Sequence, residues 1–175
     1  MGVVRAASAE DKCIQIFATE TRPALQGSRL TAFELSRDNF HVTLISDTMV
    51  GSVMSRGFID KVIVGADRIT KTGHIFNKIG TYQIAVLAKK HNIPFYCAAP
   101  SSTFDLETDW TNVIIEERSV DEIYKIGRKR IAPKKIKIFN PAFDMTPPEI
   151  VTAIITEKGV LEPDFKKSIS ESIGS

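Results

Sequence analysis

The stretch Val62–Val86, VIVGADRITKTGHIFNKIGTYQIAV, sets the pattern on which the whole chain is built. It begins with three β-branched residues, which are typical of a buried strand. A carboxylate, Asp67, follows almost at once, and the pair Asn77 and Lys78 then precedes an amphipathic segment at 81–91. This order predicts a strand, a polar loop and a helix whose first turn contains Asn77 and Lys78.

Short apolar runs alternate with amphipathic segments along the rest of the chain. The GVVRAA segment at the start is also apolar enough to be helical. Strands are predicted at 14–17, 41–45, 62–64, 94–98, 113–115 and 136–139, and helices at 27–37, 49–56, 81–91 and 147–156. Strands and helices that alternate at this spacing indicate βαβ units. The sequence therefore predicts an α/β fold, a doubly wound and mostly parallel sheet with helices on both faces.

The composition is that of an ordinary globular domain, with 43% hydrophobic and 25% charged residues. Since 23 basic and 21 acidic residues leave a net charge of only +2, we expect neither nucleic acid nor membrane as a partner. Cys13 and Cys97 lie far apart among apolar residues, which predicts small core side chains and no metal site. No signal peptide or membrane-length apolar run is recognisable, so a cytoplasmic protein is expected.

Polar side chains gather where the predicted strands end. These segments are 20–27, 46–48, 65–67, 99–103 and 140–144. In an open parallel sheet, ligands bind beyond the carboxyl ends of the strands, so these segments predict a polar ligand-binding rim. Two other interpretations stay open: Asp47 could cap the helix that follows it, and Asp67 could cap a turn or pair with Arg68.

Lys78 indicates the kind of ligand that this rim would bind. A cation in the first turn of a helix opposes the helix dipole, at a cost on the order of a few tenths of a kcal/mol. A bound anion would offset that cost, because backbone N–H groups at a helix start favour phosphate. The segment has neither Walker nor GxGxxG spacing. It therefore predicts a small phosphorylated metabolite rather than a nucleotide.

Five blocks of sequence resemble a known family. They are ETRPALQGSRLTAFEL, GADRITKTGHIFNKIGTYQIAVLAKKHNIPFY, AAPSSTFD, IEER and FNPAFDMTPPEIVTAIITEKGV. Between about Gly2 and about Pro163 they resemble the C-terminal domain of methylthioribose-1-phosphate isomerase, which is related to the regulatory subunits of translation initiation factor two-B. The resemblance implies a Rossmann-like catalytic domain at 1–163 and a homodimer. Residues 164–175 are left as a polar tail, and the small polar residues from 166 onward predict that it is frayed. It further implies a cytoplasmic aldose–ketose isomerase of methionine salvage that needs no cofactor.

The same resemblance assigns four site residues. The catalytic acid/base of the family's GAD motif falls on Asp67, and its substrate-binding Asn-Lys pair falls on Asn77 and Lys78. The substrate-binding Gln of its LQG motif falls on Gln26. The family's catalytic cysteine, in a Thr-x-Cys-Asn motif, matches neither cysteine of this chain. The resemblance therefore implies the C-terminal half of such an enzyme, without its N-terminal helical domain. We expect this half alone to bind the phosphosugar weakly and to turn it over negligibly.

Two related families stay open as alternatives. Ribose-1,5-bisphosphate isomerases share the GAD and NKIGT motifs, but AAPSSTFD and NPAFDMTP favour the methylthioribose branch, which converts 5-methylthioribose 1-phosphate to 5-methylthioribulose 1-phosphate. The initiation-factor regulatory subunits share NKIGT but usually lack the catalytic Asp. Asp67 argues against that non-catalytic class, whereas the absent cysteine motif keeps an assembly role open.

Overall fold

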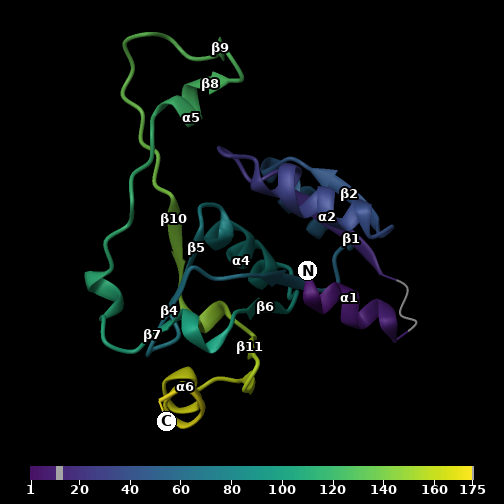
Figure 1. Cartoon of the computed structure of the whole chain (residues 1–175), viewed down its shortest axis with the longest axis vertical. Helices are drawn as coiled ribbons and strands as arrows, with labels where there is room; N and C mark the ends of the chain where they lie inside the picture. Colours follow the sequence, from purple (N-terminus) through teal and green to yellow (C-terminus); the bar gives the residue numbers. More distant parts are fainter. Residues whose placement is uncertain (11–13, 175) are drawn as a thin grey trace. The chain divides into compact units, whose positions relative to one another are not determined.

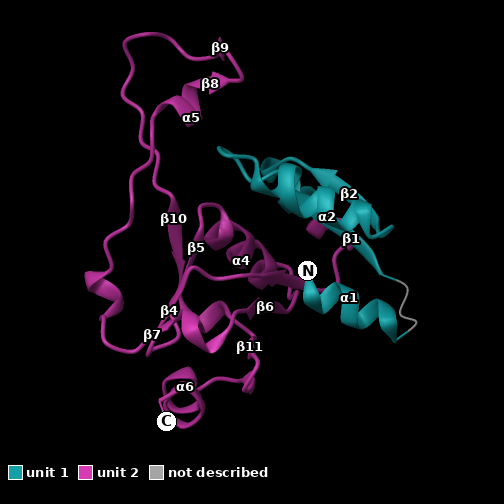
Figure 2. Ribbon diagram, viewed as in Figure 1, with its two compact units in different colours: residues 1–53 teal, residues 54–175 magenta. Residues whose placement is uncertain are grey.

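The computed structural model describes residues 1–10 and 14–174, so Cys13 lies outside the described residues. The chain divides into two compact units, Met1–Val53 and Met54–Ser175 (Figure 2). Both contain helices and parallel strand pairs, which confirms the predicted mixed α/β fold (Figure 1). The boundary predicted at residue 163 stays a prediction. No helix among the described residues is long and apolar enough to cross a membrane.

The first unit contains a pair of parallel strands together with short helices. Strands β1 and β2 pair in register from Gln15↔His41 to Thr19↔Ile45. A wide π-helical turn, η1, runs directly into α2, so the helix predicted at 27–37 is confirmed. Leu35 of α2 is only 1% exposed and anchors the core of this unit. The elements are α1 Gly2–Ala9, β1 Gln15–Thr19, η1 Gly27–Thr31, α2 Ala32–Arg37, β2 His41–Ile45 and η2 Asp47–Met49, followed by α3 Val50–Ser55.

The second unit contains a four-stranded sheet in the order β12-β11-β6-β3. Strands β3, β6 and β11 are parallel, and β12 adds an antiparallel edge. Phe95, Cys97 and Ile154 are at most 1% exposed and form its core. Helix α4 follows the predicted amphipathic pattern. The bounds are β3 Val62–Val64, α4 Thr81–Lys90, β6 Phe95–Ala98, β11 Ala153–Thr156 and β12 Gly159–Leu161.

A second four-stranded sheet, in the order β10-β5-β4-β7, was not predicted from the sequence. Its pairs β10·β5 and β5·β4 are antiparallel, and only β4·β7 is parallel. Ile69 and Ile75 are fully buried in it. This sheet carries Asn77 and Lys78 on β5. The bounds are β4 Arg68–Thr70, β5 Ile75–Lys78, β7 Phe104–Asp105 and β10 Phe143–Thr146, with the short turn η3 at Ser101–Thr103 ahead of β7.

The connection from β7 to β10 is a long excursion with α5, β8 and β9 at its far end (Figure 1). The strands predicted at 113–115 and 136–139 are wrong, because neither segment pairs as a regular strand. Their apolar residues lack a partner sheet: Ile114 is 94% exposed and Phe139 is 72% exposed. The elements here are η4 Trp110–Asn112, α5 Asp121–Tyr124, β8 Lys125–Ile126 and β9 Lys129–Arg130.

The end of the chain differs from its prediction in two places. The helix predicted at 147–156 is wrong: a single turn, η5 (Pro148–Ile150), leads into β11, where the apolar run AIIT pairs with β6. The frayed tail predicted from residue 166 is a helix, α6 (Phe165–Ser172). Asp164 caps it by accepting from Lys166 N at 3.0 Å. Phe165 and Ile169, spaced four residues apart, are 3% and 1% exposed and hold α6 in place.

Candidate functional site

Asn77 and Lys78 lie at the end of a strand, not in a helix. Helix α4 begins at Thr81, and Gly80 stands before it with φ 102°. That left-handed conformation favours glycine, and it allows the chain to turn sharply from β5 into α4. The predicted position of Lys78 in the first helical turn is therefore wrong. Lys78 does not oppose the helix dipole from within α4, so no bound anion is needed to offset such a cost.

An aspartate of the chain itself occupies the start of α4. Asp144 on β10 accepts from Gly80 N at 2.7 Å and from Tyr82 N at 3.1 Å. Burial raises the pKa of Asp144, although these two backbone N–H groups act to lower it. The anion that the sequence predicts at these N–H groups is thus a carboxylate of the protein. A phosphate would have to be bound by side chains beside them.

Asn77 is held against the same turn. It lies opposite Asp144 in the β5·β10 register. Its Nδ2 donates to Thr81 Oγ1 at 2.9 Å, and that hydroxyl donates to the backbone oxygen of Lys78 at 2.8 Å. Thr81 is itself 5% exposed. Strand pairing and this hydrogen-bond chain therefore fix the orientation of the Asn77 amide.

Lys78 lies opposite Phe143, with Nζ 6.0 Å from the centre of the ring. The side chain is half-buried, and loss of hydration is the main cause of a lowered pKa. Repulsion from Arg118 acts in the same direction, whereas Glu122 and Asp67 act against it. The ammonium group is thus incompletely hydrated, which suits binding to an anionic ligand.

Asp67 follows β3 directly, and its backbone N donates to Phe76 O at 2.9 Å. Among the described residues, no group donates a hydrogen bond to its carboxylate. Although the residue is exposed, nearby atoms remove enough water to raise its pKa, and attraction to Lys78 opposes that rise. The alternative that Asp67 pairs with Arg68 is not realised, because Arg68 pairs with Asp105 at 3.2 Å. Asp67 and Lys78 therefore lie close enough to influence each other's charge.

Gln26 belongs to the first unit and lies immediately before η1. A Cβ added to Gly27 would stand 1.8 Å from Thr19 O, so only glycine fits after Gln26. The Oε1 atom of Gln26 is buried and has no hydrogen-bond partner among the described residues. A buried acceptor without a donor is uncommon in proteins. The convergence of Gln26 with Asp67, Asn77 and Lys78 stays a prediction, because those three residues belong to the second unit.

Asp47 binds the loop that leads to Gln26. Its two carboxylate oxygens accept from Thr21 N at 2.8 Å and from Arg22 N at 2.6 Å. The alternative that Asp47 caps the following helix is not realised, since the N-cap position of η2 is Ser46. Asp47 therefore acts on the loop at 20–27 rather than on the helix after it.

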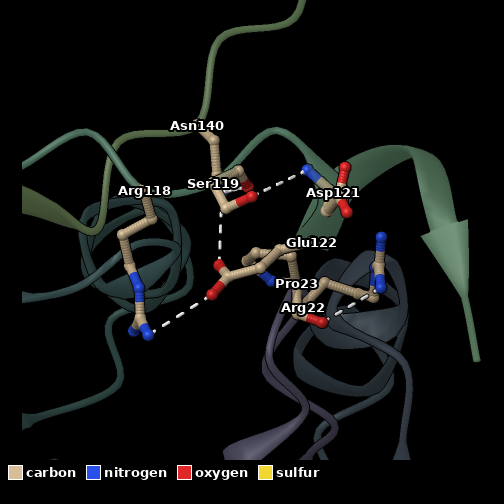
Figure 3. A network of polar contacts seen from close by, with 7 residues as sticks. All are labelled: Arg22, Pro23, Arg118, Ser119, Asp121, Glu122 and Asn140. Carbon is tan, nitrogen blue, oxygen red and sulfur yellow. Dashed lines mark hydrogen bonds and ion pairs between the residues drawn. The ribbon is translucent and has the colours of Figure 1, made fainter.

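Charged residues outside the four predicted site residues also influence the pKa of Lys78, Arg118 and Glu122 among them. Figure 3 shows Arg118 paired with Glu122, whose carboxylate accepts from Asn140 Nδ2, with separations of 3.3 and 3.2 Å. Asn140 is 3% exposed and also donates to Ser119 O at 2.8 Å. In the first unit, drawn in the same figure, Arg22 donates to Pro23 O at 3.0 Å. Arg118 and Glu122 are four residues apart, whereas Asn140 lies 18 residues beyond Glu122, so spacing in the sequence does not indicate that Asn140 joins this pair.

Cys97 is fully buried on β6, which confirms its prediction as a core residue. Burial raises the pKa of its thiol to about 12, and Sγ donates to Gly65 O at 3.5 Å. Cys97 is thus a neutral thiol at physiological pH and unsuited to proton transfer. Among the residues in the described ranges, no cluster of His, Cys, Asp and Glu side chains could hold a metal ion.

The fold and this site together define a class: a mixed α/β protein with a carboxylate, an amide and a lysine gathered beside one helix start. Residues 1–163 match the initiation factor 2 subunit family, and the chain belongs to it. Curated relatives named methylthioribose-1-phosphate isomerase include that of Carboxydothermus hydrogenoformans, 55% identical over 175 residues, covering 99% of this chain and 51% of that one. The relative from Acetivibrio thermocellus is 56% identical over 172 residues, which cover 98% of this chain and 50% of that one. The chain spans about half the length of the curated relatives it matches.

Solved structures that share the fold include proteins described as translation initiation factor eIF-2B and a methylthioribose-1-phosphate isomerase. A crystal structure described as translation initiation factor eIF-2B, subunit delta, from A. fulgidus matches with a TM-score of 0.96 and 53% identity, covering 99% of this chain and 51% of that one. The 5-methylthioribose 1-phosphate isomerase of Pyrococcus horikoshii matches with a TM-score of 0.94 and 45% identity. The match covers 98% of this chain and 48% of that one. A P. horikoshii structure described as translation initiation factor eIF-2B matches with a TM-score of 0.79 and 32% identity. The match covers 92% of this chain and 54% of that one. These matches confirm the family that the sequence blocks resemble.

Proposed function

We propose that this chain is the acid/base and substrate-binding half of an aldose–ketose isomerase that converts 5-methylthioribose 1-phosphate to 5-methylthioribulose 1-phosphate. The names of the curated relatives and of one solved relative support this reaction. The proposal includes a homodimer in the cytoplasm, with a phosphorylated sugar as its ligand and with neither nucleic acid nor membrane as a partner.

The state of Asp67 is the single observation that carries the proposal. The carboxylates of Asp47, Asp105 and Asp144 are occupied by backbone N–H groups or by an arginine. The carboxylate of Asp67 accepts no hydrogen bond within the described residues, and its pKa is raised above the ordinary value. A carboxylate that is free and holds its proton more tightly is the one suited to exchange a proton with a ligand.

Isomerisation of this substrate requires two kinds of proton transfer. The phosphate on the anomeric oxygen prevents easy ring opening, so the ring oxygen must receive a proton as its bond to the anomeric carbon breaks. A proton must then leave one carbon while another is delivered to its neighbour. Asp67 with a raised pKa can supply a proton and, once ionised, accept one. Lys78 supplies a positive charge for the phosphate, and Asn77 supplies a hydrogen-bonding amide.

Catalysis by the relatives involves about twice the length of chain present here. We propose that these 175 residues alone bind the phosphosugar weakly and turn it over negligibly, because proton transfer by one member of an acid/base pair without the other commonly costs ~10²–10⁴-fold in rate. Cys97 cannot replace a missing proton donor, since its buried thiol has a pKa of about 12.

A non-catalytic assembly role is the second candidate. The match at a TM-score of 0.96 to a structure described as an initiation-factor subunit favours it. Exposed apolar side chains on the excursion between β7 and β10 are compatible with it as well. This role needs no phosphosugar, which separates it from the first proposal by experiment.

The test is to titrate the isotope-labelled chain with 5-methylthioribose 1-phosphate and with unphosphorylated 5-methylthioribose, and to assay turnover on the same samples. We expect amide shifts at 65–82 with the phosphorylated sugar, weaker shifts without the phosphate, and negligible turnover. Absence of shifts with either sugar would favour the assembly role. Turnover at the rate of a complete enzyme would show that another residue supplies the second proton.

A further inference from the structure

Two aspartates at strand ends bind backbone N–H groups of the very loops that carry the proposed ligand-binding side chains. We infer that Asp47 and Asp144 are positioning residues: the carboxylate of Asp47 fixes the loop of Gln26, and that of Asp144 fixes the turn of Asn77 and Lys78. The identity of the ligand rests on the proposed function, whereas the two contacts stand on the structure alone.

The contacts of Asp144 span the turn between β5 and α4. One oxygen accepts from Gly80 N at 2.7 Å and the other from Tyr82 N at 3.1 Å, on either side of Thr81. Because Thr81 is the residue that Asn77 contacts, the carboxylate holds the platform of the Asn77 amide. The backbone oxygen of Ala142 accepts from Ile79 N at 3.0 Å and completes the attachment of this turn to β10. The end of β5 is thereby fixed at several consecutive residues.

The contacts of Asp47 hold a loop that is unfavourable by itself. Thr21 and Leu25 have φ of 61° and 60°, a left-handed conformation that costs energy for such side chains. Hydrogen bonds from Thr21 N and Arg22 N to a charged carboxylate offset that cost. The loop ends at Gln26, whose buried Oε1 has no partner among the described residues. A loop held in this form fixes where the Gln26 amide lies.

The three aspartates of the predicted rim differ in what their carboxylates contact. Asp47 and Asp144 are occupied by backbone groups, and Asp67 is left to meet a ligand. Loops that are fixed before binding lose less conformational freedom when a ligand arrives, so affinity depends on the residues that fix them. Removing either carboxylate should therefore weaken binding without removing any ligand contact.

The experiment replaces each carboxylate by an amide of the same shape. In Asp47→Asn and Asp144→Asn only one side-chain oxygen remains to accept, and the NH₂ group faces the second backbone N–H. The matched control is Asp109→Asn, because Asp109 also accepts a backbone N–H, from Thr111 at 3.0 Å, in a loop without proposed site residues. Asp47→Glu and Asp144→Glu keep a carboxylate with two oxygens. They should therefore restore part of the slow amide exchange and of the ligand affinity that the Asn variants lose.

Two quantities are measured on each variant of the 175-residue chain: amide hydrogen exchange without ligand, and the Kd for 5-methylthioribose 1-phosphate by titration. We expect exchange about tenfold faster at Thr21 and Arg22 in Asp47→Asn, and at Gly80 and Tyr82 in Asp144→Asn. We expect a Kd about tenfold weaker in both and unchanged in Asp109→Asn.

Unchanged exchange at the named amides, or faster exchange with an unchanged Kd, would overturn the positioning role. If the wild-type chain does not bind the phosphosugar, the proposed function fails, and the inference is decided by the side-chain amides instead. Nuclear relaxation must then show greater motion of the Gln26 side chain in Asp47→Asn, and of the Asn77 side chain in Asp144→Asn. Unchanged motion there would overturn it. If an Asn variant does not fold, the Glu variant is compared with the wild type in the same measurements.

Discussion

The pKa of Asp67 is set by two opposing influences at the scale of single residues. Loss of hydration raises it and attraction to the Lys78 ammonium lowers it, and the net direction is upward. The same attraction acts on Lys78 in reverse, where lost hydration lowers the pKa and Asp67 raises it. Each group therefore reports on the other, which makes their proximity measurable without a ligand.

The first prediction concerns this coupling. In wild-type protein the Asp67 carboxyl should titrate above the ordinary value of 3.8. Lys78→Ala should raise the pKa of Asp67 further, because the attraction that favours the carboxylate is lost. Carbon-detected NMR of the carboxyl group over a pH series measures both. The control is Lys71→Ala, an exposed lysine of the same hairpin. Titration of Asp67 at or below 3.8 would show that its environment is not as described.

The second prediction is a pH dependence of stability. Because the pKa of Asp67 is raised in the folded state, the folded protein binds more protons than the unfolded chain between 3.8 and that raised value. The free energy of unfolding should consequently fall as pH rises through this window. Asp67→Asn should make that fall smaller, as measured by urea unfolding at several pH values. Asp144 contributes with the same sign and remains in the variant. An equal fall in both proteins would contradict the assignment.

At the scale of elements, the loop between β1 and η1 is constrained by a close backbone approach at Gly27. The third prediction is that Gly27→Ala lowers the free energy of unfolding by about 1–3 kcal/mol or more, because the new Cβ would collide with Thr19 O, a backbone atom that cannot move aside cheaply. Gly65→Ala is the control, since a Cβ there meets nothing within 4 Å. Chemical denaturation of both variants provides the comparison. Equal stability would mean that the loop can relax.

Elements defined by local pattern were predictable, and those defined by distant partners were not. Strands β2, β3 and β6 and helix α4 have clear periodicity, and they occur where the sequence indicates. Strand β5 forms because residues 75–78 pair with 143–146, far along the chain, so Asn77 and Lys78 were placed in a helix instead. The runs at 113–115 and 136–139 have the composition of strands but no sheet to join.

The sequence predicted which residues belong to the candidate site better than it predicted what those residues contact. Sequence blocks named Asp67, Asn77 and Lys78, and the structure brings these three together in the second unit. That Asp144 occupies the start of α4 could not be predicted from the sequence, because it depends on the β5·β10 register. The influence of Arg118 and Glu122 on Lys78 was hidden for the same reason.

At the scale of the whole molecule, the fourth prediction concerns self-association. The proposed homodimer should be visible by light scattering at high micromolar concentration, because apolar side chains such as Phe139 and Ile126, 72% and 58% exposed, offer surface for a second copy. Phe139→Asp should shift the population toward monomer. Arg128→Asp, which changes charge on the same excursion without removing apolar area, is the control. A wild-type chain that stays monomeric at that concentration would count against the homodimer.

The proposed function requires Lys78, beside Asp67, to bind the phosphate of a sugar. The decisive measurement is the Kd for 5-methylthioribose 1-phosphate in the wild-type chain, in Lys78→Ala and in Lys71→Ala. We expect Lys78→Ala to weaken binding by about tenfold or more, since a charge-assisted contact to phosphate is lost, and to abolish most of the preference for the phosphorylated sugar. Lys71→Ala should bind like the wild type. Equal affinities in all three proteins, or no binding by the wild-type chain, would contradict the account.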